Sequence, residues 1–512
     1  MLVVDERWDI TRHEGMVLEM DQAATSEPTT APYLARFAAS PRRQAWLLAV
    51  LAAVLLAACV FYAFYLPQTP SRMARASSRL IPRLELWDAV ADLRVPGTDS
   101  RETVAALLLV VGLLAFGAYA AAIAVSWRHG DRRSTLAVAG AGAVLMAAVS
   151  VVAMPTINTD VYNYIVSARV ASEYDQNPHY VAPARFPRDP IYPYASTQYT
   201  TIPGDNKLPA WTLFNVTIAE MAGDRVVDAL LFYRGSLLVV HLASAALIVW
   251  IVRRLAPGHQ ATGLVVFAWN PIVTAYATSK SDTLMVFFLL LAVAWLVYGH
   301  ERWAVVPLTL SVLVKLLTLP LGAIYALRVL RQGSWRDLAI QAALAAGVVA
   351  LLYAPFIRGP ELIAEHLELL DEGGSGLPRS FKPLAAAGAL ALVILLGWFW
   401  SDTVPRLLQS WTLILLYFAL FLTRFAFAWY LLVLIALAAV VFNWRLHVLV
   451  VALTCSAFLV ATWSSTSNQF FPLPDLISAR VVAYYVLPLA ALVALALTLV
   501  WRRRLLSGSG AA

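Results

Sequence analysis

Residues 155–164 read PTINTDVYNY, and they separate a long apolar run from the longest polar stretch of the chain. Asn158, Thr159 and Asp160 are residue types that favour the N-terminal cap of a helix. The apolar residues that follow recur at helical spacing, so we expect a short helix that lies on the membrane surface. Asp160 and Tyr164, four residues apart, would share its upper face. Asp160 is therefore either a helix cap or a functional carboxylate at the lipid–water boundary.

The hydropathy of the whole chain decides its class. Of the 512 residues, 60% are hydrophobic and 13% are charged, and the mean hydropathy is +0.70. Apolar runs of about 17 to 25 residues recur from residue 44 to residue 500, which is typical of a polytopic helical membrane protein. We expect an all-α bundle of about 12 to 14 transmembrane helices with an extracytoplasmic cap of loops and short helices. The basic residues lie mostly between these runs, where they orient helices, so no nucleic-acid partner is expected.

The alternation of apolar and polar stretches predicts four regions. They are a disordered cytosolic tail (1–43), N-terminal transmembrane helices with an outer loop (44–133), a core (134–445) that contains the extracytoplasmic loop 155–229, and C-terminal transmembrane helices with a cytosolic tail (446–512).

Basic turns predict which side of the membrane each loop faces. The turn RHGDRR, residues 128–133, belongs in the cytosol by the positive-inside rule, which places Asp160 outside and both termini inside. Residues 304–327 are long enough for one span, yet arginines and other charges flank both of their ends. Because both ends are then expected in the cytosol, we interpret this segment as two short helices that meet near Lys315 in a hairpin.

Several charged residues occur where the chain is otherwise apolar. Arg234 lies about one turn into a predicted span, Lys280 and Arg424 lie at outer ends, and Lys315 lies deep. A charge inside a span costs about 2.5 to 3.5 kcal/mol on insertion scales, so each needs a partner or a task. Each cation either reaches toward headgroups or pairs with one carboxylate, or the four converge on an anion. Asp282 begins a span, where it is either a cap or a functional carboxylate.

Motifs for other chemistries are missing from the sequence. It contains no P-loop, no GxGxxG, no HExxH and no cluster of cysteine and histidine, so ATP hydrolysis, nicotinamide chemistry and zinc catalysis have no support. Cys59 and Cys455, the two cysteines, both fall in apolar runs. We therefore expect neither a cofactor nor a metal site.

A series of short segments gives the chain a family resemblance. In order they are TDVYNY (159–164), NPHY (177–180), LPAW (208–211), Arg234 at the start of a span, WNP (269–271), SD (281–282), VK (314–315), TRF (423–425) and WY (429–430). With these segments, residues 155–445 resemble the multi-span C-type (GT-C) glycosyltransferases that use polyprenyl-phosphate sugars. The resemblance is strongest to the polyprenol-phosphate-mannose-dependent α-mannosyltransferases of actinobacteria.

The resemblance implies an inverting transferase in the bacterial plasma membrane, with Asp160 as its catalytic residue on the extracytoplasmic side. It implies a polyprenyl-phosphate sugar as donor, a cell-envelope glycan or glycolipid as acceptor, and contact with membrane lipids. The residues expected to bind the donor phosphate or the substrates are Arg234, Lys280, Asp282, Lys315, Arg424, Tyr164 and Lys207. A flippase or other transporter of lipid-linked sugars, and a ligase or polymerase of lipid-linked glycans, remain alternatives, but a transporter needs no carboxylate beside the sugar.

Overall fold

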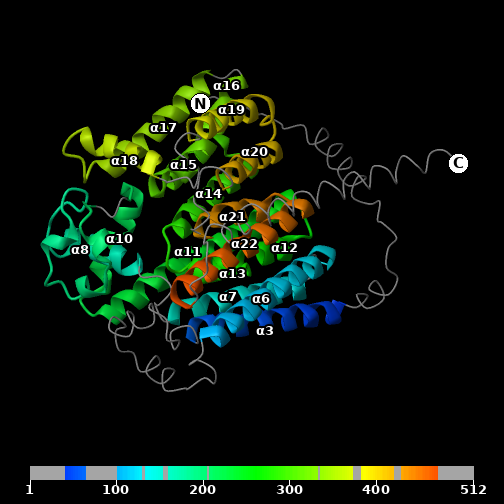
Figure 1. The fold of residues 1–512 in the computed structure, drawn as a ribbon. Coiled ribbons are helices and arrows are strands. Elements are labelled where there is room, and N and C mark those ends of the chain that lie inside the picture. The colour runs from blue at the N-terminus through cyan, green and yellow to red at the C-terminus, as the bar shows by residue number, and fades with distance from the viewer. Residues whose placement is uncertain are drawn as a thin grey trace.

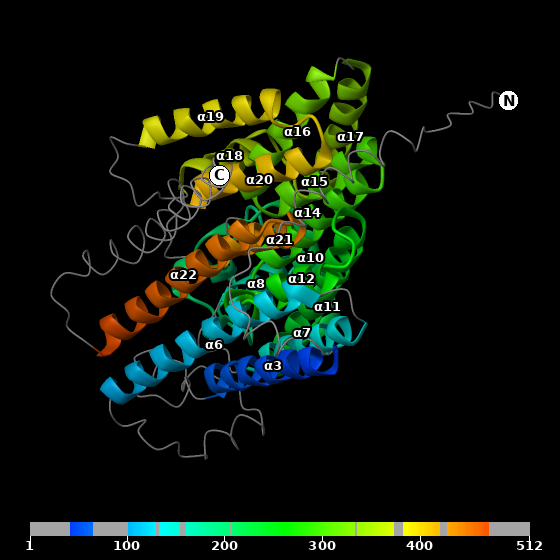
Figure 2. The same ribbon diagram turned by 90° about the vertical axis from the view of Figure 1, so that its right-hand side faces the viewer.

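A computed structural model describes residues 41–64, 101–129, 133–153, 160–203, 207–332, 335–372, 382–419 and 428–470. Across these ranges the chain folds into helices and contains no β-strand, which confirms the all-α prediction. Figures 1 and 2 both show helices α3, α6 and α7 on one side of the bundle and α16, α17, α19 and α20 on the opposite side. The predicted tail 1–43 lies almost entirely outside the described residues, as do Arg424 and residues 471–512 of the predicted C-terminal region.

The helices follow one another along the chain in three groups. The N-terminal group is α3 (Pro41–Phe64), α6 (Arg101–His129) and α7 (Arg133–Val152). The cap contains α8 (Asp160–Ser172), η2 (Pro183–Arg185), η3 (Tyr192–Tyr194), α9 (Thr197–Thr200) and α10 (Pro209–Ala222). The third group is α11 (Val226–Leu255), α12 (Gln260–Ala268), α13 (Pro271–Tyr276), α14 (Asp282–Val297), α15 (Glu301–Val314), η5 (Leu316–Thr318), α16 (Leu319–Arg331), α17 (Trp335–Tyr353), α18 (Glu361–Glu372), α19 (Lys382–Phe399), α20 (Val404–Tyr417), η8 (Ala428–Leu431), α21 (Leu432–Val440) and α22 (Trp444–Phe470).

Six helices in the described ranges are long and apolar enough to cross a membrane, which identifies a polytopic membrane protein. They are α3, α6, α7, α11, α17 and α19. Other apolar stretches form shorter helices or are interrupted, as at residues 262–277, which contain most of α12 and all of α13. There Pro271 has no backbone N–H to continue α12. Asn270 instead caps α13, since its side-chain oxygen accepts a hydrogen bond from the backbone N–H of Ile272 at 2.9 Å.

Buried hydrogen bonds tie the N-terminal helices to the core. The hydroxyl of Tyr119 on α6 donates to the carbonyl of Val266 at 2.6 Å, and the indole Nε1 of Trp269 donates to the carbonyl of Ala139 on α7 at 2.9 Å. A Cβ at Gly142 would lie 2.6 Å from the Trp269 ring, so the glycine lets the indole approach α7. These contacts fix the first half of α7 against the core.

The segment around Lys315 forms the predicted hairpin. Helix α15 ends at Val314 and Lys315 is extended, with φ −161° and ψ 132°. The Arg328 guanidinium donates two hydrogen bonds of 3.0 and 3.1 Å to the Glu301 carboxylate, and the Tyr325 hydroxyl donates to the Glu301 carbonyl at 2.6 Å. The start of α15 and the end of α16 therefore lie together, which confirms the hairpin and leaves Lys315 at its tip.

Helix α8 begins at Asp160, as the capping residues predicted, but it does not lie on a surface. Every side chain from Val161 to Val170 is buried within the protein, so the prediction of a surface helix is wrong. The physical reason is that the faces of α8 outside its apolar stripe carry aromatic and polar side chains, which are also packed inside the protein. Tyr164, for example, packs edge-on against Trp211 of α10, with ring centroids 5.1 Å apart. Figure 1 shows α8 and α10 together at one end of the bundle.

A buried arginine holds the cap together. Arg169 on α8 donates from Nε to the Asp189 carboxylate at 2.7 Å and from Nη2 to Asp224 at 2.7 Å. Asp189 also accepts from the Tyr174 hydroxyl at 3.0 Å and from the backbone N–H of Ile191 at 2.9 Å. Because a buried carboxylate with several donors is stable only in a fixed geometry, this network sets the position of α8 and so of Asp160.

Candidate active site

Two lysine–aspartate pairs lie where the cap meets the bundle. Lys280, in the turn before α14, donates from Nζ to Oδ2 of Asp160 at the start of α8. Lys315, at the tip of the hairpin, donates to both carboxylate oxygens of Asp282, at 2.8 and 3.0 Å. Since Lys280 and Asp282 are separated only by Ser281, the two pairs are neighbours, and Lys280 lies within electrostatic reach of both carboxylates. The structure thus brings together four of the residues that the sequence singled out.

Two consecutive aromatic residues of η8 support the lysines. The Nζ of Lys280 lies 3.6 Å from the centroid of the Trp429 ring, and the Nζ of Lys315 lies 3.9 Å from the centroid of the Tyr430 ring. A cation over an aromatic face is attracted by the ring quadrupole, with roughly 2 kcal/mol or more where the pair is desolvated. The segment Trp429-Tyr430, which the sequence marked only by resemblance, therefore forms one wall of the site.

Solvent exposure distinguishes the two pairs. In the first pair the Asp160 side chain is 32% exposed and the Lys280 side chain is 3% exposed. In the second pair the order is reversed, because the Lys315 side chain is 22% exposed and the Asp282 side chain is 1% exposed. Part of the Asp160 side chain in the first pair and part of the Lys315 side chain in the second are therefore accessible from outside.

Lys207 and Tyr164 extend the site along the cap. The Nζ of Lys207 lies 5.6 Å from the centroid of the Tyr164 ring. The charge of Lys207 also reaches Lys280 and Tyr430. Lys207 therefore adds a third ammonium group to the same region.

The structure gives Arg234 a different environment. Arg234 is buried in α11, and its Nη1 donates to the carbonyl of Val151 at 3.2 Å and to that of Ala153. These carbonyls end α7, where the helix dipole favours a cation. The Nε of Arg234 has no hydrogen-bond partner among the described residues. Lys280 and Lys315 each pair with one carboxylate, which was one of the alternatives for these cations, whereas Arg234 serves the end of α7. The convergence of the cations on an anion stays a prediction, and Arg424 lies outside the described residues.

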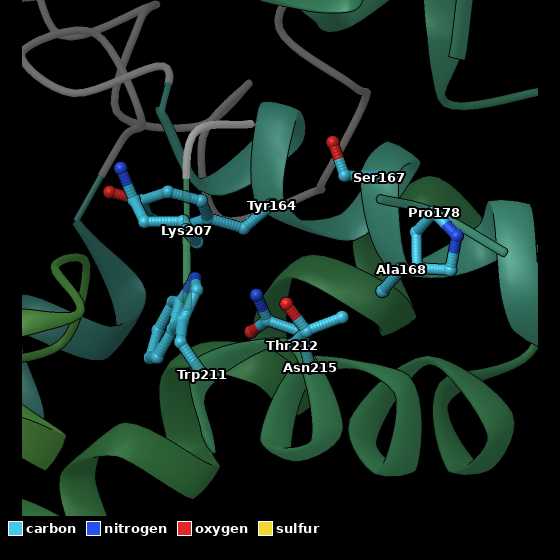
Figure 3. A pocket seen from close by; sticks show the side chains of 8 residues that line it. All are labelled: Tyr164, Ser167, Ala168, Pro178, Lys207, Trp211, Thr212 and Asn215. Atoms are coloured by element: carbon cyan, nitrogen blue, oxygen red, sulfur yellow. The ribbon is translucent and has the colours of Figure 1, made fainter. Parts of the chain in front are cut away.

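A groove opens between α8 and α10, as Figure 3 shows. Its empty space is about 240 Å³, part of which is open to solvent. The residues that line it are Tyr164, Ser167, Ala168, Pro178, Lys207, Trp211, Thr212 and Asn215. The groove therefore shares Tyr164 and Lys207 with the region of the charged pairs.

The segment Asn177–Tyr180 joins the cap to the second half of the chain. The Asn177 amide donates to the carbonyl of Phe356 at 2.6 Å. The His179 ring lies 4.8 Å from the Phe356 ring and 5.1 Å from the His366 ring on α18. His366 is buried and hydrogen-bonded to the hydroxyl of Tyr353 at 2.9 Å. Burial lowers the pKa of His179 to about 3 and that of His366 to about 4.

Because these two histidines are buried between the cap and α18, we expect the stability of the protein to depend on pH. Both imidazoles are neutral when buried, and both regain an ordinary pKa of about 6.5 when exposed, so unfolding takes up protons below that pH. The free energy of unfolding is thus at its full value above pH 6.5. It falls as the pH drops toward 4, by about 1.4 kcal/mol per pH unit for each histidine. Thermal unfolding of the detergent-solubilised protein between pH 7.5 and 5.5 measures this loss. We expect His366→Phe to reduce it and the exposed-site control His300→Gln to leave it unchanged.

No group of three or more histidine, cysteine, aspartate or glutamate side chains in the described ranges is arranged to hold a metal ion. The charged groups at the site are instead lysines and aspartates in close pairs. The expectation that the protein works without a metal or cofactor stays a prediction.

Fold and site together define an α-helical membrane protein with paired carboxylates and ammonium groups at one end of its bundle. The sequence model of the MptA_B family, described as the N-terminal domain of alpha-(1->6)-mannopyranosyltransferase, matches residues 73–331, just over half of the chain. The chain belongs to this family and is a glycosyltransferase that acts on mannose, which confirms the resemblance to the actinobacterial enzymes. No curated protein and no solved structure matches it. The matched range includes both lysine–aspartate pairs and ends with α16.

Proposed function

We propose that this protein transfers mannose, with inversion, from a polyprenyl-phosphate donor to a hydroxyl group of a cell-envelope glycan or glycolipid, forming an α-(1→6) linkage. The reaction takes place at the extracytoplasmic face of the plasma membrane. The observation that carries the proposal is the partly exposed side chain of Asp160, which pairs with the buried Lys280 and lies near the partly exposed side chain of Lys315.

Asp160 acts as the general base. Its carboxylate takes the proton of the acceptor hydroxyl while the hydroxyl oxygen attacks the anomeric carbon of the donor. The bond between that carbon and the phosphate oxygen breaks, and the electron pair leaves with the polyprenyl phosphate, through a transition state of oxocarbenium character. Lys280 contacts one carboxylate oxygen, Oδ2, so it holds the side chain in place.

The ammonium groups stabilise the leaving phosphate. A phosphate leaves without taking up a proton, so the task of the protein is to balance its negative charge. Lys315 is within electrostatic reach of Asp160, and Lys207 is within reach of Lys280. Charge-assisted hydrogen bonds from such cations to phosphate are about twice as strong as neutral ones. Arg424 belongs to the same phosphate site in this proposal. Arg234 is not part of this site, because it donates to the carbonyls at the end of α7.

The distribution of arginines supports an extracytoplasmic site. At the end of the bundle away from Lys315 and Asp282, Trp250 of α11 stacks on Tyr298, which follows α14, with ring centroids 4.3 Å apart. Arg253 and Arg254 follow Trp250 on α11, and the Glu301–Arg328 pair closes the hairpin at its far end. By the positive-inside rule, this arginine-rich end faces the cytosol together with the termini, and the site faces the opposite side.

A transfer assay separates this proposal from its rivals. Purified protein in detergent is incubated with radiolabelled polyprenyl-phosphate mannose and a mannose-terminated glycan, and the products are analysed by mass spectrometry and NMR. We expect the acceptor to gain single mannose residues, without any energy source, with the anomeric configuration opposite to that in the donor. Gain of a whole glycan would identify a ligase or polymerase. Movement of intact donor across vesicle membranes without any transfer would identify a flippase.

A further inference from the structure

The charges of the two lysine–aspartate pairs could combine in two ways. In the structure Lys280 contacts Asp160, and Lys315 contacts Asp282. Each lysine also lies within electrostatic reach of the second carboxylate, because the charge of Asp282 acts on Lys280 and that of Asp160 acts on Lys315. A lysine carries a compact charge on a flexible four-carbon stem, so its ammonium group can change partners. Attraction between opposite charges therefore does not by itself choose between the two pairings.

Burial does not favour the observed pairing either. The first pair joins the Lys280 side chain, 3% exposed, to that of Asp160, 32% exposed. The second joins the Asp282 side chain, 1% exposed, to that of Lys315, 22% exposed. The exchanged pairing would join the two buried charges to each other. Because a buried charge needs a close partner of opposite sign, that exchange would still satisfy Lys280 and Asp282.

The exchanged pairing would be unproductive for transfer. It would place the ammonium group of Lys315 on the carboxylate of Asp160, so the proposed base and a proposed phosphate-binding cation would neutralise each other. In the observed pairing these two side chains have different partners, and each keeps an accessible part. The activity therefore depends on which lysine pairs with which aspartate.

Two neighbouring aromatic rings distinguish the pairings. The Nζ of Lys280 lies 3.6 Å from the centroid of the Trp429 ring, and the Nζ of Lys315 lies 3.9 Å from the centroid of the Tyr430 ring. The attraction of a desolvated ammonium group to such a ring corresponds to a factor of about 30 in an equilibrium constant. Each ring thus favours the place that its ammonium group occupies now, beside its present carboxylate.

We propose that Trp429 and Tyr430 are positioning residues that fix the pairing of the four charges. Trp429 holds Lys280 at Asp160, and Tyr430 holds Lys315 away from Asp160. The consequence for catalysis rests on the proposed function, whereas the pairing itself is a property of the protein without substrates.

The pairing is tested without substrates, by NMR of the detergent-solubilised protein with ¹³C at the lysine Cε. The chain has four lysines, Lys207, Lys280, Lys315 and Lys382, so four signals are expected, and single lysine-to-arginine variants assign them. An ammonium group over an aromatic face has its neighbouring methylene protons shifted upfield by the ring current. The spectrum therefore reports separately whether Lys280 and Lys315 remain over their rings.

Three changes at one position separate the ring from its charge distribution. Tyr430→Phe keeps the ring, Tyr430→Leu removes it, and trifluorophenylalanine at position 430 keeps the shape of the ring while its fluorines withdraw electron density from the face. Phe399→Leu is a control at an exposed aromatic residue of α19.

The signal of Lys280 decides the outcome, because the changes are made at the ring of the other lysine. We expect Tyr430→Leu and the fluorinated ring to shift it, since Lys315 then moves to Asp160 and displaces Lys280. Tyr430→Phe and Phe399→Leu should leave it in place. If the Lys280 signal does not respond to the leucine variant or to the fluorinated ring, the rings do not choose the pairing and the proposal is wrong. If Tyr430→Leu does not fold, the fluorinated ring decides alone.

Transfer assays then test the consequence for catalysis. We expect Tyr430→Leu to lower kcat/KM for the lipid donor by about 30-fold and Tyr430→Phe to transfer mannose at close to the wild-type rate. Normal transfer by Tyr430→Leu would overturn the positioning role. A wild-type protein that shows the Lys280 response but transfers no mannose would contradict the proposed function and leave the pairing intact.

Discussion

Replacing Asp160 by asparagine is expected to lower the rate of mannosyl transfer by a factor of about 10² to 10⁴, the usual contribution of general-base catalysis. Asparagine keeps the size of the side chain and its ability to cap α8, but it cannot accept the proton of the acceptor hydroxyl. The measurement is the turnover number of the purified variant at saturating donor and acceptor. Binding of the donor should persist, because the lysines are unchanged.

The ion pair with Lys280 requires a second variant as a control. Asparagine leaves the Lys280 ammonium buried without its carboxylate, with the Trp429 ring 3.6 Å away, and this alone could reduce activity. The double variant Asp160→Asn/Lys280→Met removes both charges. We expect it to recover stability but not transfer. Transfer within tenfold of the wild-type rate in the double variant would mean that Asp160 only neutralises Lys280, and Asp282 would become the candidate base.

Replacing Lys315 by methionine is expected to destabilise the protein by about 3 to 5 kcal/mol. The Asp282 carboxylate is 1% exposed and accepts two hydrogen bonds from Lys315, so removal of the lysine leaves a buried charge without its cation. Thermal and denaturant unfolding of the detergent-solubilised protein measure the loss. Lys382→Met is a matched control, since Lys382 lies at the start of α19 in a different part of the bundle.

The double variant Asp282→Asn/Lys315→Met separates stability from catalysis. Because the buried charge is removed together with its partner, we expect most of the lost stability to return. Transfer should nevertheless stay about 10²- to 10³-fold below the wild-type kcat/KM for the donor, since Lys315 is proposed to stabilise the leaving phosphate. A stable double variant with normal transfer would limit Lys315 to a structural role.

Local features were predictable from the sequence because they depend on short stretches of chain. The apolar runs identified the membrane class, and the cap residues predicted that a helix starts at Asp160. The charges on both sides of residues 304–327 predicted the hairpin, whose tip is Lys315. Unusual cations in apolar surroundings marked Lys280 and Lys315 as residues that need a partner.

Only the tertiary structure decided which partners these residues have. Lys280 pairs with Asp160, 120 positions earlier in the chain, and its Nζ lies over the Trp429 ring. No local sequence pattern encodes either contact. The same holds for Arg234, which donates hydrogen bonds to carbonyls at the end of α7 and does not join the lysine–aspartate pairs. The sequence by itself determined which charges would be costly in a membrane, because that cost depends on local hydropathy. Which carboxylate offsets each charge depends on packing between distant helices, which also buried α8 on every side.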